Sequence, residues 1–282
     1  MGVKDDEMAY RPLLRQEWRE GILEGSDDDA VAVEAPLQIR VNGAPVAVVM
    51  RTPGHDEYLG LGMLLAEGAI ETLDDVRSIR HCDEVEDERS EGNVLQVVVP
   101  EHRVAAIERM RRTNLTGSSC GVCGRTSIDD LLATRHSLAD RCEMIAPGVI
   151  EGAAQALSTA QPTFVRTGGV HGVGLFTHEG ELLRVFEDVG RHNAVDKALG
   201  WRLKHGVTSG ALLMVSGRVS FEIVQKAMMS GVPIVAAVSA PTSLAVELAT
   251  ACGMTLACFV RGSRICVYAG AERLSDSSAR TR

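Results

Sequence analysis

The C-terminal half of the chain alternates between strand-like and helix-like segments, and this pattern constrains the fold more than any other feature of the sequence. Strands are predicted over Ala211–Ser216, Pro233–Val238 and Met254–Val260, separated by helices over Ser220–Met229 and Thr242–Cys252. Strands that are joined by single helices pair in parallel through right-handed crossovers. The pattern therefore predicts an α/β fold built on a parallel sheet, with a last strand near Ile265–Tyr268.

The segment before this run adds a hairpin and two helices. Val170–Thr177 and Glu181–Glu187 are predicted as antiparallel strands around the turn Glu179-Gly180. One helix is expected near Gly152–Ser158 and another over Arg191–Lys204. Together with the run that follows, these segments predict a three-layer α/β sandwich with one antiparallel hairpin.

The N-terminal half predicts a smaller α+β domain. It opens with an alternating segment followed by Asn42-Gly43, a strong hairpin turn signal. The predicted elements are a strand Leu37–Val41, a strand Val46–Met50, a helix over about 57–67 that Gly68 ends, a strand Val94–Val99 and a short helix Val104–Arg111.

These blocks divide the chain into five segments. Residues 34–113 form the small α+β domain, residues 127–270 form the α/β domain, and a loop at 114–126 separates them. Residues 1–33 and 271–282 are polar, and this composition predicts mobile ends.

Composition excludes several classes of function. The 282 residues are 45% hydrophobic, which suffices for a core, and the net charge of −9 gives no general electrostatic reason to bind nucleic acid. The acidic segment Met1–Glu34 lacks the apolar region of a signal peptide, and no apolar stretch is long and charge-free enough to span a bilayer. We therefore expect a cytoplasmic protein that binds neither membranes nor nucleic acids.

The seven cysteines are odd in number and irregularly spaced, which indicates reduced thiols rather than a disulfide framework. Cys252, Cys258 and Cys266 lie in apolar surroundings, so we expect them to be inert core residues. A four-ligand zinc site would need a second CxxC pair, and none occurs. His81-Cys82 is better explained as an exposed turn, so no metal site is predicted.

Cys120 and Cys123 form a CxxC pair in the polar, glycine-rich segment Gly117–Arg125. No apolar run borders this segment closely, so its thiols can reach a partner. Arg125, and two further arginines at 111 and 112, favour the reactive thiolate. A lone CxxC also suits a disulfide, half of a zinc site or two idle thiols; on its own it favours metal or redox use over sulfur transfer.

Four polar junctions follow strands of the α/β domain, at the edge where open parallel sheets collect ligands. Three of them lead into helices, whose N-termini suit phosphate, and arginines at 191, 218, 261 and 264 could add charged contacts. We therefore expect a pocket for a phosphorylated or dinucleotide-like ligand, although Ser220, Thr242 and Ser243 also suit simple helix caps. The junctions are Glu187–Asn193, Ser216–Ser220, Ser239–Ser243 and Phe259–Arg264.

The order of helices and strands in this domain resembles that of the cytidine deaminases. Those enzymes place an H-x-E motif on one helix and P-C-x-x-C on the next to bind zinc. This chain reads His192-Asn193-Ala194 at the first position and has no cysteine in Gly217–Phe221 at the second. We therefore expect a deaminase-like scaffold without zinc or deaminase activity, in which His192 orients the pocket or contacts the ligand.

Several motifs together resemble the formate dehydrogenase accessory proteins, the FdhD family of sulfur carriers, over about Pro36–Tyr268. The most specific are the CGVCG loop at Cys120–Gly124 and the run DVGRHNAVDK at Asp188–Lys197. The one departure is Met63 after Gly62, where the family tends to have phenylalanine. The other motifs are Glu34–Leu37, Val41–Gly43, Arg51–Gly54, Ala66–Gly68, Thr167–His171, Ser216–Arg218 and Ser239–Ser243.

The resemblance implies that the chain accepts sulfur from a cysteine desulfurase and passes it to the bis-guanine-dinucleotide molybdenum cofactor, bis-MGD, before that cofactor enters formate dehydrogenase. Cys120 would carry the persulfide, and Cys123 would assist or resolve it. The family also implies a homodimer. The residues expected to bind the cofactor are Phe259, Val260, Arg261, Gly262, Ser263 and Arg264 from the resemblance, with Arg218, Ser239, Thr242 and His192 from the junctions.

Two other functions remain open from the residues alone: a thiol–disulfide oxidoreductase, and a non-catalytic nucleotide- or metal-binding module. The first is disfavoured because the CxxC pair does not begin a helix after a strand in a thioredoxin-like unit. A carrier gains sulfane sulfur from a desulfurase, an oxidoreductase only cycles a disulfide, and a zinc protein holds stoichiometric metal.

Overall fold

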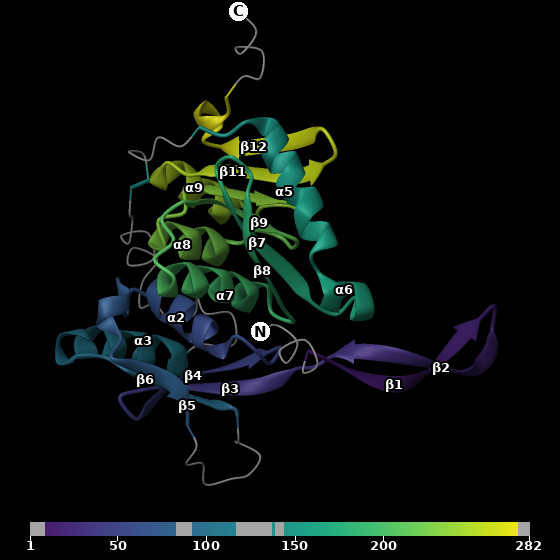
Figure 1. The fold of residues 1–282 in the computed structure, drawn as a ribbon, viewed down its shortest axis with the longest axis horizontal. Helices are drawn as coiled ribbons and strands as arrows, with labels where there is room; N and C mark the ends of the chain where they lie inside the picture. Colours follow the sequence, from purple (N-terminus) through teal and green to yellow (C-terminus); the bar gives the residue numbers. More distant parts are fainter. Residues whose placement is uncertain (1–8, 83–91, 117–136, 139–143, 276–282) are drawn as a thin grey trace, which may run out of the picture.

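Three sheets organise this computed structural model within residues 9–82, 92–116, 137–138 and 144–275, the parts of the chain that the structure describes. A six-stranded sheet carries the C-terminal half, a four-stranded sheet carries the N-terminal half, and a two-stranded ribbon begins the chain (Figure 1). No helix in these parts of the chain is both long and apolar enough to cross a membrane.

A mixed sheet of six strands forms the centre of the larger unit. Its strands are β7 (His171–Thr177), β8 (Leu182–Asp188), β9 (Gly210–Val215), β10 (Ile234–Ala237), β11 (Thr255–Arg261) and β12 (Arg264–Ala269). They lie in the order β12-β11-β10-β9-β7-β8, and β9, β10 and β11 run parallel as predicted. The expectation of one antiparallel hairpin is wrong, because β11 and β12 form a second one. The chain reverses there at Gly262, whose φ of 54° suits glycine.

Helices cover both faces of this sheet (Figure 1). α7 (Arg191–Lys204), α8 (Phe221–Met229) and α9 (Ser243–Cys252) pack on one face, and α5 (Pro147–Thr159) packs on the other. Successive residues of a strand point to opposite faces. Leu213 and Val215 of β9 accordingly join the core under α7–α9, whereas Leu212 and Met214 join the core under α5. The expected three layers are present; the likeness to cytidine deaminases stays a prediction.

The smaller unit is a four-stranded sheet in the order β4-β3-β6-β5 with two helices. β3 and β4 form the hairpin that Asn42-Gly43 predicts, and β3 pairs in parallel with β6. The elements are β3 (Ala35–Val41), β4 (Ala44–Arg51), α2 (Asp56–Ala66), β5 (Ser78–His81), β6 (Val94–Val98) and α3 (Val104–Thr116), which extends past the expected end at Arg111.

Two glycines let α2 of the smaller unit cross α7 of the larger one almost backbone to backbone. A Cβ on Gly200 would lie 1.9 Å from the carbonyl oxygen of Tyr58, and a Cβ on Gly62 would lie 2.0 Å from that of Asp196. No real side chain tolerates such distances, so both positions need glycine. The two units are therefore packed together through this helix crossing.

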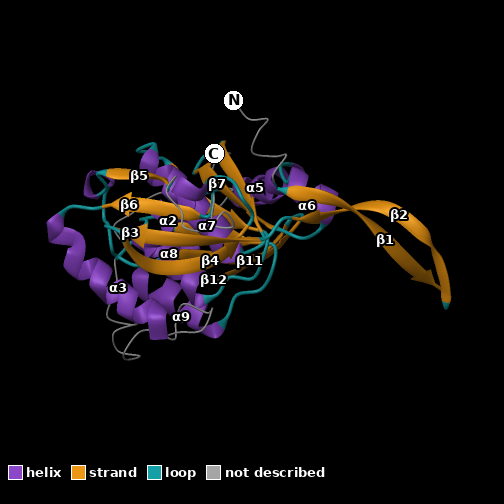
Figure 2. Ribbon diagram, turned by 90° about the horizontal axis from the view of Figure 1, so that it is seen from below, coloured by secondary structure: helices purple, strands orange, loops and turns teal. Residues whose placement is uncertain are grey.

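The first 33 residues, expected to be mobile, instead contain a long antiparallel ribbon. β1 (Tyr10–Arg19) pairs with β2 (Ile22–Ala32) around a turn in which Glu20 and Gly21 both have positive φ. The ribbon projects away from the rest of the protein (Figures 1 and 2). Sequence patterning missed it because charged residues are interspersed among its apolar ones and most of its length lies apart from the other described elements.

The expectation of a mobile end over 271–282 is also wrong for its first residues. Ala271–Arg273 form a 3₁₀ turn, and the Arg273 side chain is buried. Its guanidinium donates to the carbonyl oxygens of Leu138 at 2.6 Å and Gly253 at 2.5 Å. Residues 276–282 lie outside the described part of the chain.

We predict that Gly200→Ala destabilises the protein strongly, because its Cβ would meet the Tyr58 carbonyl oxygen. Overpacking a close contact costs about 1–3 kcal/mol or more. Gly152→Ala in α5 is the matched control, since nothing lies within 4 Å of its Cβ position. Helix propensity favours alanine there by about 1 kcal/mol. Urea unfolding measures both variants, and equal free energies of unfolding would contradict the close crossing.

Candidate functional site

The first three polar junctions lie side by side along one edge of the six-stranded sheet. Nε2 of His192, in the first junction, lies 3.1 Å from the hydroxyl oxygen of Ser220 in the second. The second and third junctions are joined by the Val219 N–H, which donates to the carbonyl oxygen of Ala240 at 3.0 Å. The topology thus brings together segments that are far apart in sequence, as expected for this edge of an open sheet.

The fourth junction joins them at Phe259. Its N–H donates to the carbonyl oxygen of Ser239 at 3.1 Å, and its φ of 52° is left-handed. Such a backbone in a non-glycine residue costs of order 1–3 kcal/mol, so surrounding contacts must hold it. One such contact is with Tyr268 of β12, whose ring centroid lies 6.4 Å from that of Phe259. Val260 is only 3% exposed and belongs to the core under α5, so its side chain is not available to a ligand.

The remaining predicted residues are exposed. Arg218 lies between β9 and α8, and Thr242 directly precedes α9. Arg261 and Arg264 face each other across the β11–β12 ladder, with Gly262 and Ser263 as the turn between them. No described residue forms an ion pair or hydrogen bond with the guanidinium of Arg218, Arg261 or Arg264, which leaves these cations available to an anion.

The position of His171 beside Arg191 at the second junction was not singled out from the sequence. A Cβ on Gly217 would lie 3.4 Å from Nδ1 of His171 and 3.7 Å from Cδ of Arg191, so these groups surround the second junction. Burial, followed by the charges of Arg191 and His192, lowers the pKa of His171. The carboxylate of Glu222 lies 2.8 Å from Nε2 of His192. The backbone of Gly217 therefore lies beside the Arg191 side chain and beside the imidazole of His171, whose lowered pKa favours the neutral ring.

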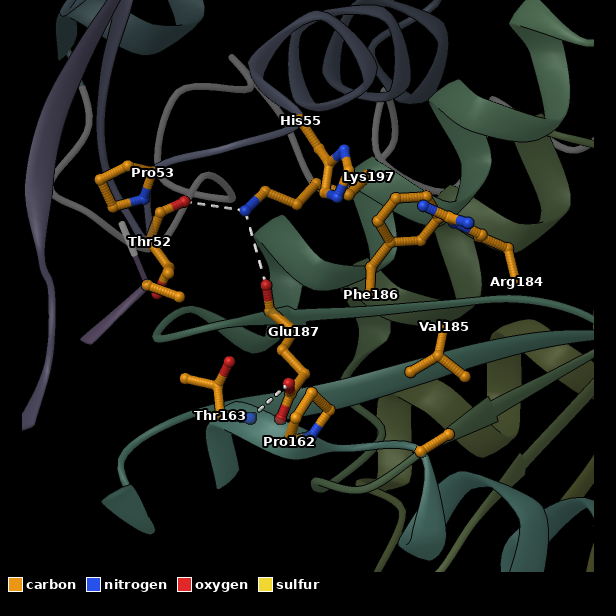
Figure 3. A pocket seen from close by; sticks show the side chains of 12 residues that line it. Thr52, Pro53, His55, Pro162, Thr163, Arg184, Val185, Phe186, Glu187 and Lys197 are labelled. Atoms are coloured by element: carbon orange, nitrogen blue, oxygen red, sulfur yellow. Dashed lines mark hydrogen bonds between the residues drawn. The ribbon is translucent and has the colours of Figure 1, made fainter. Parts of the chain in front are cut away.

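A buried ion pair of the larger unit holds the loop between β4 and α2 of the smaller unit, residues 52–55, at this edge. Nζ of Lys197 lies 2.7 Å from Oδ2 of Asp188, and the two side chains are 1% and 0% exposed. Lys197 also donates to the carbonyl oxygens of Thr52 at 2.8 Å and Glu187 at 3.5 Å (Figure 3). The Thr52 N–H donates to Asp188 at 3.2 Å. A cavity of about 300 Å³ opens beside these groups, between the loop, β8 and the short helix α6 (Pro162–Thr167).

These contacts divide the DVGRHNAVDK run into two kinds of residue. Asn193 donates to the carbonyl oxygen of Met50 at 2.7 Å and to Asp188 at 3.0 Å. Asp196 pairs with Lys226 of α8 at 2.7 Å. Asp188, Asn193 and Lys197 therefore hold the two units together, Asp196 joins α7 to α8 within the larger unit, and Arg191 and His192 are left to serve the edge of the sheet.

A second buried pair shapes the other side of the same loop. Arg51 is 2% exposed and donates to both carboxylate oxygens of Asp56, at 2.9 and 2.8 Å. A hydrogen bond to Asp56 raises the pKa of His81. Neither His81 nor Cys82 belongs to a metal-like cluster, since the described residues hold no group of three or more His, Cys, Asp and Glu side chains suited to a metal. Within those residues His81 is a structural partner of the loop.

The cysteines differ in their access to solvent. Cys120 and Cys123 lie outside the described residues. Cys252 and Cys258 are buried, and burial raises the pKa of the Cys258 thiol to about 12. Cys266 is partly exposed. The prediction of inert core thiols is therefore confirmed for Cys252 and Cys258.

We predict that Lys197→Met lowers the free energy of unfolding by about 3–5 kcal/mol, because it leaves the charge of Asp188 buried without its partner. Lys204→Met is the control, since its ion pair with Glu57 is 37% and 39% exposed and such pairs contribute about 0–1 kcal/mol. Urea unfolding at neutral pH compares the two. Similar losses would show that the buried pair does not hold the units together.

Comparison with known proteins identifies the family. Residues 32–275 match the FdhD/NarQ family. The sulfur carrier protein FdhD of Anaeromyxobacter dehalogenans is 48% identical over 261 residues, covering 89% of this chain and 90% of that protein. The protein of the same name from Nocardia farcinica is 46% identical over 258 residues, covering 90% and 91%. A crystal structure of a protein from Desulfotalea psychrophila, described as a formate dehydrogenase accessory protein, has a TM-score of 0.75 at 26% identity and covers 95% of this chain and 100% of that one. The resemblance of the motifs is thereby confirmed, and the chain belongs to the FdhD/NarQ family.

Proposed function

We propose that this protein is a sulfurtransferase of the carrier type, which accepts persulfide sulfur from a cysteine desulfurase and delivers it to bis-MGD for formate dehydrogenase. The observation that carries the proposal is the family match over residues 32–275, which includes the Cys120–Cys123 pair. Relatives that are 46–48% identical over about nine-tenths of the chain are named sulfur carriers.

The thiol chemistry assigns separate roles to the two cysteines. The Cys120 thiolate attacks the outer sulfur of the desulfurase persulfide, the sulfur–sulfur bond of the donor breaks, and the donor cysteine leaves as a thiolate. The new persulfide on Cys120 is then the form that carries sulfur to the cofactor. Cys123 assists or resolves this persulfide. Neighbouring arginines at 111, 112 and 125 favour the thiolate that begins the transfer.

The edge of the six-stranded sheet is the proposed binding site for the cofactor, which is the substrate here. Its guanine dinucleotide arms carry phosphates, and phosphates suit exposed guanidinium groups and backbone N–H groups at helix starts. Arg218, Arg261 and Arg264 have no partner among the described residues, and His192 lies at the start of α7 beside the second junction. These observations support a phosphate-binding edge built from the predicted residues.

The partners and the place of action follow from the same proposal. The protein would meet a cysteine desulfurase and then formate dehydrogenase in the cytoplasm, and it would act as a homodimer. Persulfide chemistry needs neither zinc nor a resident cofactor. Two results would favour the other functions. If Cys120 and Cys123 only cycled between thiols and a disulfide, without gaining sulfur, the protein would be an oxidoreductase. If the wild-type protein held stoichiometric zinc that His192→Ala lost, it would have a metal-dependent function.

We predict that Cys120→Ala abolishes sulfur loading, because the attacking thiolate is lost. Intact-mass analysis after incubation with a cysteine desulfurase and cysteine should show one added sulfur on the wild-type protein and none on the variant. Cys258→Ser is the matched control and should load normally, since that thiol is buried. Full activation of formate dehydrogenase by Cys120→Ala would contradict the assignment.

We predict that Arg218→Ala and Arg261→Ala each weaken the binding of guanosine diphosphate about tenfold or more. Losing one hydrogen bond to a charged group costs about 1.5–3 kcal/mol, and about 1.4 kcal/mol corresponds to a tenfold change in affinity. Isothermal calorimetry measures the effect, with Arg80→Ala as the control because Arg80 is exposed on β5 of the smaller unit. Sulfur loading of Cys120 should persist in all three variants. Unchanged affinity in both edge variants would place the nucleotide site elsewhere.

A further inference from the structure

Two cysteines lie directly opposite each other in the hairpin that ends the six-stranded sheet. Cys258 of β11 is the register partner of Cys266 of β12, and both are free thiols. Opposed residues of antiparallel strands have Cα atoms about 4.5 or 5.5 Å apart, with their side chains on the same face. A disulfide needs a Cα separation of about 4.4–6.8 Å, so the backbone already holds this pair within range.

The electrostatics of Cys258 agree with this placement. Burial, followed by the charge of Cys266, raises the pKa of the Cys258 thiol to about 12. Cys252 is a second buried thiol of the same core, but it donates to the carbonyl oxygen of Ala249 in its own helix at 3.6 Å. Cys266 is therefore the thiol that the fold presents to Cys258.

The two thiols differ in their access to a dissolved oxidant. Cys258 is 0% exposed and lies in the core under α7–α9, whereas Cys266 is partly exposed. The thiolate is the reactive form of cysteine, and a pKa near 12 keeps Cys258 protonated at neutral pH. A small oxidant therefore meets Cys266 first, and Cys258 lies behind it.

The hairpin has the freedom that a bond between the sulfur atoms requires. Cβ atoms of opposed residues lie about 4.5–5.5 Å apart, whereas a disulfide holds them at about 3.8 Å. Within the described residues β12 pairs with β11 alone, so it can move toward β11 without breaking another strand pairing. The ladder is also irregular beside Cys258, where the backbone of Phe259 is left-handed. A disulfide formed with some strain is readily reduced again.

We infer that Cys258 and Cys266 form a redox-active pair, in which a hydroperoxide oxidises Cys266 and Cys258 then forms a reversible disulfide with it. The pair lies at the end of the sheet far from the smaller unit (Figure 1), so its oxidation leaves the joint between the units intact. The inference is independent of sulfur transfer, because Cys120 and Cys123 take no part in it.

The reaction needs two steps and one peroxide. The Cys266 thiolate attacks one oxygen of hydrogen peroxide, the oxygen–oxygen bond breaks, and the leaving hydroxide takes up the proton that Cys266 had released. Cys266 is then a sulfenic acid. The Cys258 sulfur attacks the sulfenic sulfur, the sulfur–oxygen bond breaks, and water leaves with the proton of Cys258. Two thiols are thereby oxidised to a disulfide, and one peroxide is reduced to two waters.

The buried thiol protects the exposed one in this reaction. A sulfenic acid that meets no second thiol is oxidised further to sulfinic acid, which thiols do not reduce. Because Cys258 is already opposite Cys266, the disulfide forms before a second peroxide arrives.

Non-reducing peptide mapping of the full chain after treatment with hydrogen peroxide tests the inference. Trypsin cuts after Arg261 and Arg264, so the two cysteines fall in separate peptides unless a disulfide joins them. The wild-type protein should give the joined peptides, lighter by two hydrogens than their sum, and dithiothreitol should separate them. Cys252 shares a tryptic peptide with Cys258, so Cys252→Ser is the matched control and should still form the link.

Two variants separate the roles of the pair. Cys258→Ser should lose the link, and dimedone should then trap a sulfenic acid on Cys266. Sulfinic acid on Cys266 should rise at least tenfold over the wild-type protein at equal peroxide. Cys266→Ser, which changes a partly exposed position, should lose the link while the Cys258 thiol stays unoxidised.

Four results would overturn the inference. They are a native wild-type protein without the link after excess peroxide, a link that forms only after unfolding in urea, a link that Cys252→Ser abolishes, and a Cys258 thiol that is oxidised as fast in Cys266→Ser as in the wild-type protein. A protein that forms the link but takes up no sulfur from a desulfurase would contradict the proposed function and leave the inference standing.

Discussion

The buried contact between Asp188 and Lys197 is the interaction on which the rest of the structure depends. It joins the end of β8 to α7 and holds the backbone of Thr52 from the smaller unit at the same point. A buried ion pair stabilises a fold only when the remaining hydrogen-bond donors and acceptors of both groups also have partners. The Thr52 backbone, the Gly190 N–H and the Asn193 amide satisfy Asp188 here. The glycine crossing of α2 and α7 completes the joint between the units.

This joint explains why a long motif can be both structural and functional. Its buried residues lock the start of α7 relative to the sheet, so that Arg191 and His192 lie beside the second junction in one fixed arrangement. Preorganised donors bind an anion without a further cost of ordering. In the proposed function, the rigid edge holds the cofactor while the CxxC loop brings the sulfur. A single fold would thus bind the acceptor and carry the donor atom on separate parts of the chain.

Much of the fold could be predicted from the sequence, because its apolar periodicity reflects burial. α7 was expected over Arg191–Lys204 and is found there, and the parallel order of β9, β10 and β11 follows from single-helix connections. The β1–β2 ribbon was missed because most side chains of β1 are exposed to solvent, so burial does not impose a clear apolar pattern on its sequence. Glu222 was missed as the partner of His192 because only the crossing of α7 and α8 brings them together. Val260 was assigned to the site from its position in a motif, but strand alternation turns its side chain into the core.

The transfer of labelled sulfur tests the central claim most directly. The protein is loaded by a cysteine desulfurase with sulfur-labelled cysteine, separated from the donor, and mixed with bis-MGD and apo formate dehydrogenase. The account predicts that the label leaves Cys120, appears in the enzyme-bound cofactor, and does so in proportion to the formate oxidation that is gained. Activation of the enzyme without movement of the label, or label that stays on the protein while activity appears, would contradict it.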